Sequence, residues 1–451
     1  MTDLLSIVLA AGEGTRMRSS LPKVLHPVGG LPMVSHVVRA ALAAGSSHLA
    51  FVVGPGHAAV REQMLSLAAD AHVVEQTERL GTGHAVRQAE AAYAAAAGNV
   101  VVLYGDTPFV SAATIRGVAA RLDAGADIVV VGFEPDDPTG YGRLLTDGDR
   151  LVAIREHRDA TEHERQVGIC NSGIMGFRAD ALRKLIGQIG NSNAKGEYYL
   201  TDAVELANAA GRKVEFTVVP EREVMGLDDR NKLARAEGLF QETQREAFMK
   251  AGVTLKDPGS VFFSWDTQIG QDVTIFPNVV FGLGVKIAND VEIRAFCDIE
   301  DVVIGEGASI GPFARIRGGA ELGANVHLGN FVEVKKSILH DGVKAGHLAY
   351  LGDAEIGAAT NIGAGTITAN YDGANKFKTI IGERAFIGTN SSLVAPVTIG
   401  DGAFVATGSV VTKDVEGDAL AIGRARQENK PGYAPKLRAR AQAIKAAKAG
   451  K

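Results

Sequence analysis

The chain has 451 residues, which suggests two to four domains that each bury a core of their own. Its 47 Lys and Arg against 52 Asp and Glu give a net charge of −5, so no overall positive field would attract nucleic acid or an anionic membrane. The two cysteines, Cys170 and Cys297, are too few for a disulfide framework and too far apart for a CxxC pair. The N-terminus lacks a basic segment, and its first apolar run is much shorter than a bilayer span. These features predict a cytoplasmic protein with reduced thiols.

The first 225 residues alternate short β-branched runs with alanine-rich helical stretches, which is the rhythm of βαβ units. This half is therefore predicted to be α/β with a mostly parallel sheet. The expected strands are residues 6–10, 48–53, 99–104 and 127–131, and the expected helices are residues 32–44, 58–69 and 83–97.

Residues 229–251 read as one long amphipathic helix, because Leu233, Ala236, Phe240 and Ala247 recur at helical spacing among charges. We expect this helix to connect two domains. The predicted division is a domain over residues 1–227, a linker helix over 228–251 and a second domain over 252–451, which ends in a basic, solvated and partly helical tail.

After residue 258 the apolar residues recur every six positions, a period that fits neither an α-helix nor plain strand alternation. It indicates the hexapeptide repeat of a parallel β-helix, in which each aliphatic side chain points to the axis. The glycine excess, 54 of 451 residues, suits the tight corners of such a coil. Residues 337–353 and 370–378 break the period and are expected to be loops on a binding face. The two regular runs are Ile304, Ile310, Ile316, Leu322, Leu328, Val334 and Ile381, Ile387, Leu393, Ile399, Val405, Val411.

A glycine-bearing loop, Leu-Ala-Ala-Gly-Glu-Gly-Thr-Arg-Met, follows the first predicted strand, and Leu-Pro-Lys comes shortly after it. Backbone N–H groups at the end of a parallel strand can bind phosphate, and Arg16 and Lys23 add positive charge. Asp106 follows another buried strand, so it should lie at the same edge of the sheet, where open α/β sheets bind ligands.

These segments, with Gln76 and the run Leu-Gly-Thr-Gly-His-Ala over residues 80–85, resemble the signature of sugar-1-phosphate nucleotidyltransferases, and of the uridyl members in particular. The resemblance implies Mg²⁺ held by Asp106 and by Asp228, which stands where the family usually has Asn. A carboxylate suits Mg²⁺ as well as an amide does. The resemblance places UTP and UDP-N-acetylglucosamine on Leu9, Ala10, Gly12, Arg16, Lys23, Gln76, Gly81, Thr82, Tyr104, Gly140, Glu156, Asn171 and Thr201.

In the repeat region, Arg317 and Lys335 differ by 18 residues, which is one coil of a triangular β-helix, so they should stack on one face and attract an anion. This region resembles the acetyltransferase half of the bifunctional N-acetylglucosamine-1-phosphate uridyltransferase and glucosamine-1-phosphate acetyltransferase family, whose β-helix is left-handed. The resemblance makes His347 the general base, a role that neutral imidazole suits near pH 7. It implies glucosamine-1-phosphate on Arg317, Lys335, Tyr350, Asn361 and Lys376, and acetyl-CoA on Asn370, Tyr371, Thr389, Thr407 and Arg424, where Thr389 and Thr407 replace the usual Ser and Ala.

The resemblance implies an enzyme that makes UDP-N-acetylglucosamine, a cell-wall precursor, from glucosamine-1-phosphate, acetyl-CoA and UTP. It further implies Mg²⁺ as cofactor and a homotrimer formed through the β-helix, with no nucleic-acid or membrane partner. Two alternatives stay open. The β-helix could be only an oligomerisation or regulatory domain, or the chain could be a non-enzymatic scaffold. Release of CoA and nucleotide-dependent release of pyrophosphate distinguish them.

Overall fold

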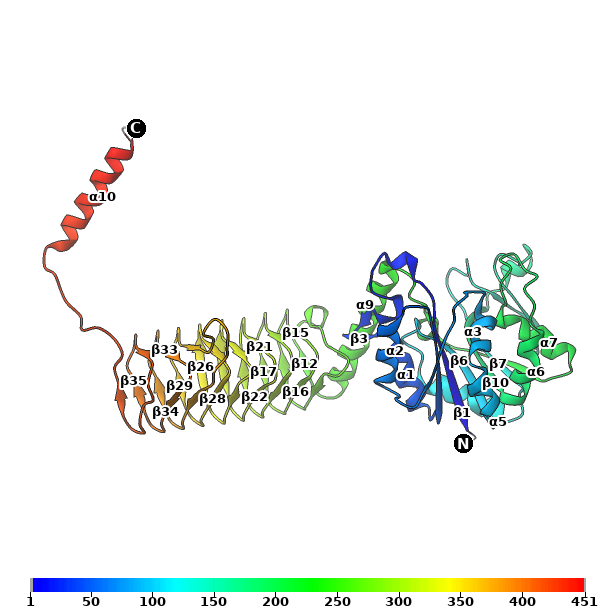
Figure 1. Ribbon diagram of the computed structural model, residues 1–451, viewed down its shortest axis with the longest axis horizontal. Helices are drawn as coiled ribbons and strands as arrows, with labels where there is room; N and C mark the ends of the chain where they lie inside the picture. Colours follow the sequence, from blue (N-terminus) through cyan, green and yellow to red (C-terminus); the bar gives the residue numbers. More distant parts are fainter. Residues whose placement is uncertain (1–2, 149, 450–451) are drawn as a thin grey trace. The chain divides into compact units, whose positions relative to one another are not determined.

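The structure is a computed structural model that describes residues 3–148 and 150–449, so the outer ends of both predicted domains, at residues 1 and 451, lie outside the described part. The chain forms two compact units that meet at Gln244 and Arg245 (Figure 1). This boundary falls inside α9 (Arg230–Lys250), the helix that the sequence predicts as the connector. Its buried residues are Ala236, Phe240 and Gln241.

The first unit is built on a mixed sheet whose strands follow the order β11-β7-β10-β6-β1-β4-β5. β1 pairs in parallel with β4 and β6, whereas β10 runs antiparallel to β6 and β7. Every residue of β1 is buried, which explains its continuous apolar sequence. All four predicted strands are present. The strand bounds are β1 Leu4–Ala10, β4 His48–Val53, β5 His72–Glu75, β6 Asn99–Tyr104, β7 Ile128–Phe133, β10 Cys170–Arg178 and β11 Val214–Val218, with hairpins β2 Pro27–Val28, β3 Leu31–Pro32 and β8 Arg143–Asp147, β9 Arg150–Arg155.

The helices of this unit cover the sheet, and one of the predicted helices is divided. The expected helix over residues 83–97 is wrong as a single element, because Ala89 leaves helical geometry with φ −86° and ψ 20°. Ser111 caps α5 by accepting a hydrogen bond from the Thr114 N–H. The helices are α1 Met33–Ala43, α2 Ala58–Leu65, α3 Thr82–Gln88, α4 Glu90–Ala95, α5 Ala112–Asp123, α6 Ala179–Leu185, α7 Ala203–Ala209 and α8 Glu221–Val224.

The second unit is a parallel β-helix in which each coil contributes one short strand to each of three sheets. The first sheet consists of β12 Thr254–Leu255, β14 Thr274–Ile275, β17 Glu292–Ile293, β20 Ser309–Ile310, β23 His327–Asn330, β26 Lys344–His347, β29 Asn361–Ile362, β32 Phe386–Ile387, β35 Phe404–Val405 and β37 Leu420–Ala421. The second sheet consists of β15 Val280–Phe281, β18 Asp298–Ile299, β21 Arg315–Arg317, β24 Glu333–Lys335, β27 Tyr350–Gly352, β30 Ile367–Ala369, β33 Ser392–Val394 and β36 Val410–Val411. The third sheet consists of β13 Gln268–Ile269, β16 Val285–Ile287, β19 Val302–Ile304, β22 Ala320–Leu322, β25 Ile338–Leu339, β28 Ala354–Ile356, β31 Thr379–Ile381 and β34 Val397–Ile399.

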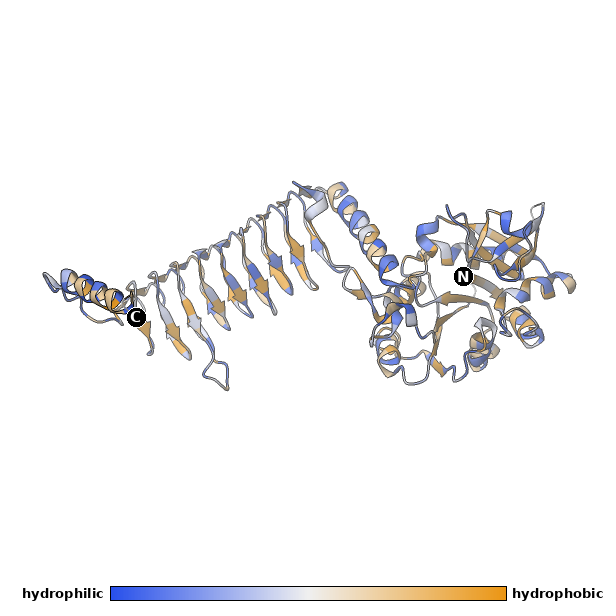
Figure 2. Ribbon diagram, turned by 90° about the horizontal axis from the view of Figure 1, so that it is seen from above, coloured by the Kyte–Doolittle hydropathy of each residue, from blue (hydrophilic) through white to orange (hydrophobic). Residues whose placement is uncertain are grey.

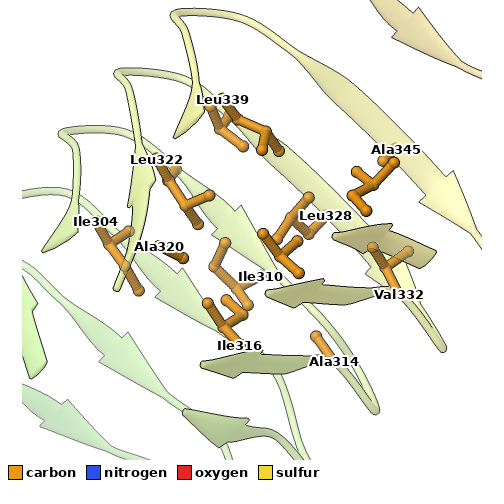
Figure 3. Packing of buried hydrophobic residues seen from close by; sticks show 14 of the residues in the cluster. Ile304, Ile310, Ala314, Ile316, Ala320, Leu322, Leu328, Val332, Leu339 and Ala345 are labelled. Carbon is orange, nitrogen blue, oxygen red and sulfur yellow. The ribbon is translucent and has the colours of Figure 1, made fainter. Parts of the chain in front are cut away.

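The six-residue period is the packing pattern of this unit. Ile304, Ile310 and Ile316 point inward from three successive strands and are at most 1% exposed (Figure 3). In the second sheet Ile316 pairs with Val334 of the next coil, so like residues stack along the axis. Hydrophobic and hydrophilic residues alternate along the short strands (Figure 2). The predicted β-helix is confirmed.

The two predicted breaks have different outcomes. Residues 337–353 are not a loop: β25, β26 and β27 continue all three sheets, and Leu322 pairs with Leu339, one residue short of an 18-residue coil. That expectation is wrong because a corner absorbs the missing residue. Residues 370–378 do form an insertion, since Ile356 pairs with Ile381, seven residues beyond an 18-residue coil. A bridge between Tyr371 and Lys376 closes it.

The chain after the β-helix carries α10 (Tyr433–Ala449), and no residue of this helix is buried. The expected helical and solvated character of the tail is therefore confirmed for the residues described. Across the described ranges, no helix is both long enough and apolar enough to cross a membrane.

Candidate active sites

The carboxyl ends of β1 and β6 bring the glycine-bearing loop and Asp106 to one cleft of about 350 Å³. The Gly105 N–H donates to the Leu9 carbonyl at 2.9 Å, which joins the two segments. Many residues predicted from the nucleotidyltransferase signature lie here, whereas Arg79 and Glu197 were outside the prediction although both belong to segments next to it. The lining residues are Leu9, Ala10, Ala11, Gly12, Lys23, Val24, Gln76, Arg79, Gly81, Thr82, Ala85, Tyr104, Asp106 and Glu197.

The glycine-bearing loop needs Gly14 for a steric reason. Gly14 has φ +62°, and a Cβ at this position would collide with the side chain of Lys23. Arg79 holds the loop from the other side, because its Nε donates to the Ala11 carbonyl at 3.0 Å. The loop is thus fixed close to Lys23, and Lys23 is directed into the cleft.

Lys23 binds two carboxylates that are far apart in the sequence. Its Nζ forms an ion pair with Asp106 and lies 3.5 Å from Asp228 Oδ1. Asp228 Oδ2 also forms ion pairs with Lys232 Nζ at 3.1 Å and with Arg16 Nη2 at 3.4 Å. Burial lowers the pKa of Lys23, but the charges of Asp106 and Asp228 outweigh burial and hold this pKa above its usual value. Burial raises the pKa of Asp228, and Lys23, Lys232 and Arg16 together bring it below its usual value.

Asp106 and Asp228 therefore converge on one position that already holds a cation. This arrangement fits a divalent ion, because carboxylate oxygens are hard ligands of the kind that Mg²⁺ prefers. Among the described residues no group of three or more His, Cys, Asp or Glu is placed to hold a metal. A metal at this position would complete its coordination with substrate phosphates and water.

The segment that carries Gln76, Gly81 and Thr82 is anchored to the chain around residue 198. Gly81 has φ +105°, and a Cβ there would meet the Tyr198 carbonyl oxygen. The Gly83 N–H donates to that same oxygen at 2.8 Å, and the Thr82 hydroxyl accepts from the Leu200 N–H at 3.1 Å. Gln76 is 5% exposed and donates from Nε2 to the Gly81 carbonyl at 3.2 Å. This end of the cleft is therefore held by several backbone and side-chain hydrogen bonds.

Of the four residues predicted to hold the sugar, Glu156 and Thr201 contact each other, Asn171 contacts a neighbouring backbone group, and Gly140 lies in a turn. The Thr201 hydroxyl lies 3.5 Å from Glu156 Oε1, and burial raises the pKa of Glu156. Asn171 Oδ1 accepts from the Gly173 N–H at 3.0 Å, while Gly173 leaves no room for a Cβ against the Tyr104 ring. The remaining residue, Gly140, lies in a turn with φ +88°.

In the β-helix, three cations gather on the second sheet and the insertion. Arg317 and Lys335 are register partners on β21 and β24, so the expected stacking is confirmed. Glu333 Oε1 accepts from Arg317 Nε and Nη2 at 3.0 and 2.7 Å. Lys376 lowers the pKa of Lys335, first through a hydrogen bond and then through its positive charge. The charge of Arg317 lowers this pKa further. Mutual repulsion of this kind is relieved by an anion.

His347 is exposed at the end of β26, where the chain turns from the first sheet to the second. Its Nδ1 lies 2.8 Å from Asn330 Oδ1, and the two residues are register partners. An amide oxygen only accepts, so Nδ1 carries the hydrogen and Nε2 presents its lone pair to solvent. Sequence reasoning missed Asn330, although it stands one short coil before His347.

The other predicted residues of this unit lie on the insertion, on neighbouring strands and along a corner. Asn370 donates from Nδ2 to Asp353 Oδ2 at 2.5 Å, and the Tyr371 hydroxyl donates to the Gly373 carbonyl at 2.5 Å. Tyr350 begins β27 and Asn361 begins β29.

The three residues predicted for acetyl-CoA farther along the chain form a column. The Gly408 N–H donates to the Thr389 carbonyl at 2.8 Å. Arg424 donates from Nη1 to the Thr407 carbonyl at 2.9 Å. Thr389, Thr407 and Arg424 thus occupy successive coils on one corner, and all three are exposed.

The fold and its two sites define a nucleotidyltransferase joined to a hexapeptide-repeat transferase. Residues 6–167 match the model of the MobA-like NTP transferase domain, residues 301–336 match the bacterial transferase hexapeptide, and residues 378–413 match the hexapeptide repeat of succinyl-transferase. The chain is 52% identical over 437 residues to the Bifunctional protein GlmU of Azorhizobium caulinodans, covering 97% of this chain and 98% of the relative. It is 51% identical over 449 residues to the Bifunctional protein GlmU of Paramagnetospirillum magneticum, covering 99% of each.

The chain belongs to the family of bifunctional proteins named GlmU. Its two activities are therefore those of a UDP-N-acetylglucosamine diphosphorylase and a glucosamine-1-phosphate N-acetyltransferase. The predicted family, the fold class with its left-handed β-helix and the bifunctional activity are confirmed, and the non-enzymatic scaffold is excluded.

Proposed function

We propose that the two activities are divided between the two units, with uridyl transfer in the cleft around Lys23 and acetyl transfer beside His347. Two observations support this division. Lys23, Asp106 and Asp228 converge at the first site, and the cations Arg317 and Lys335 stack at the second. Each unit thus has its own place for a sugar phosphate.

In the acetyltransferase half, Arg317, Lys335 and Lys376 bind the phosphate of glucosamine-1-phosphate, with Tyr350 and Asn361 completing the sugar site. His347 Nε2 takes a proton from the substrate amine as its nitrogen attacks the thioester carbonyl carbon of acetyl-CoA. The carbon–sulfur bond then breaks and CoA leaves. Asn330 keeps His347 in the tautomer that can accept the proton. Asn370, Tyr371, Thr389, Thr407 and Arg424 bind acetyl-CoA.

In the uridyltransferase half, a phosphate oxygen of N-acetylglucosamine-1-phosphate attacks the α-phosphorus of UTP, and pyrophosphate leaves. Lys23 and Arg16 offset the charge that develops on the phosphates. Gln76, Gly81 and Thr82 hold the uracil, while Gly140, Glu156, Asn171 and Thr201 hold the amino sugar. Because the reaction transfers the nucleotidyl group directly, the site needs positioning and electrostatics but no protein nucleophile.

Mg²⁺ is the proposed cofactor, and Asp106 and Asp228 would hold it. When bound, it would neutralise phosphate charge and orient the triphosphate. Asp228→Asn tests this role: apparent Mg²⁺ affinity in the pyrophosphate assay should fall while activity returns at high Mg²⁺. Equal affinity in native enzyme, Asp228→Asn and Asp228→Ala would show that Asp228 is not a ligand.

We further propose that the enzyme is a cytoplasmic homotrimer assembled through the β-helix. An aromatic column supports a subunit interface beside His347. Phe296, Phe313 and Phe331 stack with centroids 4.9 and 5.1 Å apart, although each is about half exposed, and exposed Leu348 continues the corner. Sedimentation of native enzyme and Phe313→Ser tests the assembly. A monomeric native enzyme would contradict it.

The division of labour is tested by separating the two activities. Asp106→Ala should abolish pyrophosphate release and leave CoA release nearly intact, and His347→Ala should do the reverse, because distant sites without shared partners behave independently. Loss of both activities in a folded Asp106→Ala variant would contradict the division. CoA release that survives His347→Ala would remove His347 from its proposed role.

A further inference from the structure

His84 on α3 lies between two glutamine amides. Gln76 Nε2 is 3.2 Å from His84 Nδ1, and Gln88 Nε2 is 3.1 Å from His84 Nε2. A neutral imidazole has one lone pair and one N–H, so it cannot accept a hydrogen bond from both amides. One of the two amides must therefore present its oxygen to the ring.

The surroundings decide which amide is reversed. Gln76 Nε2 also donates to the Gly81 carbonyl at 3.2 Å, and turning this amide would place two oxygens against each other. Gln88 has only a weaker second contact, to the His84 carbonyl at 3.4 Å. Gln88 is thus the amide that turns its oxygen to the ring. His84 Nε2–H donates to Gln88, and His84 Nδ1 accepts from Gln76.

This arrangement of hydrogen bonds determines which way the side-chain amide of Gln76 faces. Both N–H groups of its amide are directed to Gly81 and His84, so Oε1 is the end of the amide that these two contacts do not use. Gln76 lines the nucleotide cleft, so the oxygen is left for a ligand. An oxygen accepts from N3–H of uracil, whereas N3 of cytosine is itself an acceptor and would be repelled.

We propose that His84 is a positioning residue for nucleobase selectivity, because it holds the Gln76 amide with its oxygen toward the base. The inference rests on the proposed uracil role of Gln76. Without His84, the amide of Gln76 would lose one of the two contacts that fix its orientation. It could then turn its N–H toward the ligand, and discrimination against cytosine would weaken.

The experiment measures kcat/KM for UTP and CTP in His84→Ala, His84→Asn and native enzyme. The UTP to CTP ratio should fall by about tenfold in His84→Ala, which is the order of one well-placed hydrogen bond. Asn can place an oxygen near the position of Nδ1, so His84→Asn should retain most of the ratio. If His84 had only a structural role, its loss would lower kcat/KM for UTP and for CTP by the same factor. An unchanged ratio would therefore overturn the inference.

Two further variants separate this inference from the role of Gln76. If Gln76→Ala leaves the ratio unchanged, uracil recognition lies elsewhere and both statements fail. If Gln76→Ala lowers the ratio but His84→Ala does not, only the role of His84 is overturned. The double variant should have the same ratio as Gln76→Ala alone, since both residues act through one amide. A further drop in the double variant would contradict this coupling.

Discussion

Replacing Lys23 by methionine should destabilise the first unit and at the same time strengthen its response to Mg²⁺. Lys23 neutralises Asp106 and Asp228 in a part-buried site, where the side chains of Lys23 and Asp106 are 13% and 17% exposed. Breaking a buried ion pair costs about 3–5 kcal/mol, and breaking an exposed pair costs about 0–1 kcal/mol. For this intermediate burial we expect a loss of about 2–3 kcal/mol.

A domain of this size loses about 2–4 °C of melting temperature per kcal/mol, so the first unit of Lys23→Met should melt about 4–12 °C lower. A divalent ion can then occupy the position of the ammonium group. Added Mg²⁺ should therefore raise the melting temperature more in Lys23→Met than in native enzyme. Uridyl transfer should still fall by about 10²–10³-fold, because a preorganised positive charge is lost from the transition state.

Scanning calorimetry with and without Mg²⁺ measures both effects, and acetyl transfer serves as the folding control. Lys232→Met is the matched variant, because Lys232 contacts Asp228 but not Asp106 and is more exposed. It should lose no more than about 1 kcal/mol. Suppose that Lys23→Met melts at the same temperature as native enzyme, and that Mg²⁺ raises its melting temperature no more than that of native enzyme. Lys23 then does not hold the two carboxylates, and the reasoning is refuted.

Three further outcomes follow from the geometry. Lys335→Ala should raise the KM for glucosamine-1-phosphate by about 10- to 100-fold with little change in kcat, as measured by CoA release, because one cation of the phosphate cluster is lost. Ile316→Ala, at a fully buried position, should cost about 2–5 kcal/mol in chemical unfolding, whereas Val303→Ala, at a position 49% exposed, should stay within about 0.5 kcal/mol. The pKa of Asp228 is below its ordinary value of 3.8, so its ionised form stabilises the fold above that pH and the contribution disappears as pH falls through the lowered pKa. Without Mg²⁺, the difference in melting temperature between native enzyme and Asp228→Asn should therefore be present at pH 7 and shrink below about pH 4, and a constant difference would contradict it.

The sequence predicts those parts of the fold in which local pattern and burial coincide. Residues 49–53 and 100–103 are continuous apolar runs because both faces of the sheet are covered. The six-residue period of the β-helix persists because each buried aliphatic residue occupies the same place in a coil. β10 was not predicted, because its antiparallel pairing follows from tertiary packing and has no local signal. The loop predicted over residues 337–353 is wrong because a coil that is one residue short interrupts the six-residue period while its strands still continue the sheets.

The same contrast applies to the sites. Lys23 and Asp106 stand in motifs with chemical meaning, so the sequence alone points to them. Asn330 acts on His347 only through the register of two neighbouring coils, and Glu333 meets Arg317 in the same way. The 18-residue coil predicts the register of Arg317 and Lys335, but Asn330 and His347 are only 17 residues apart, so the regular period does not reveal this pair. His84 lies within the Leu-Gly-Thr-Gly-His-Ala run, but its proposed role depends on two amides that the fold brings to its ring.

The stacking of coils also places binding residues at a fixed, regular spacing along the β-helix. Side chains in register on neighbouring coils, such as Arg317 and Lys335, are separated by the spacing of adjacent strands, which is about 4.8 Å. A ligand bound along this surface is therefore matched in steps of that length. Because each coil contacts only its neighbours, adding or removing a whole coil would move one group of binding residues relative to another by one such step and leave the packing within each group intact.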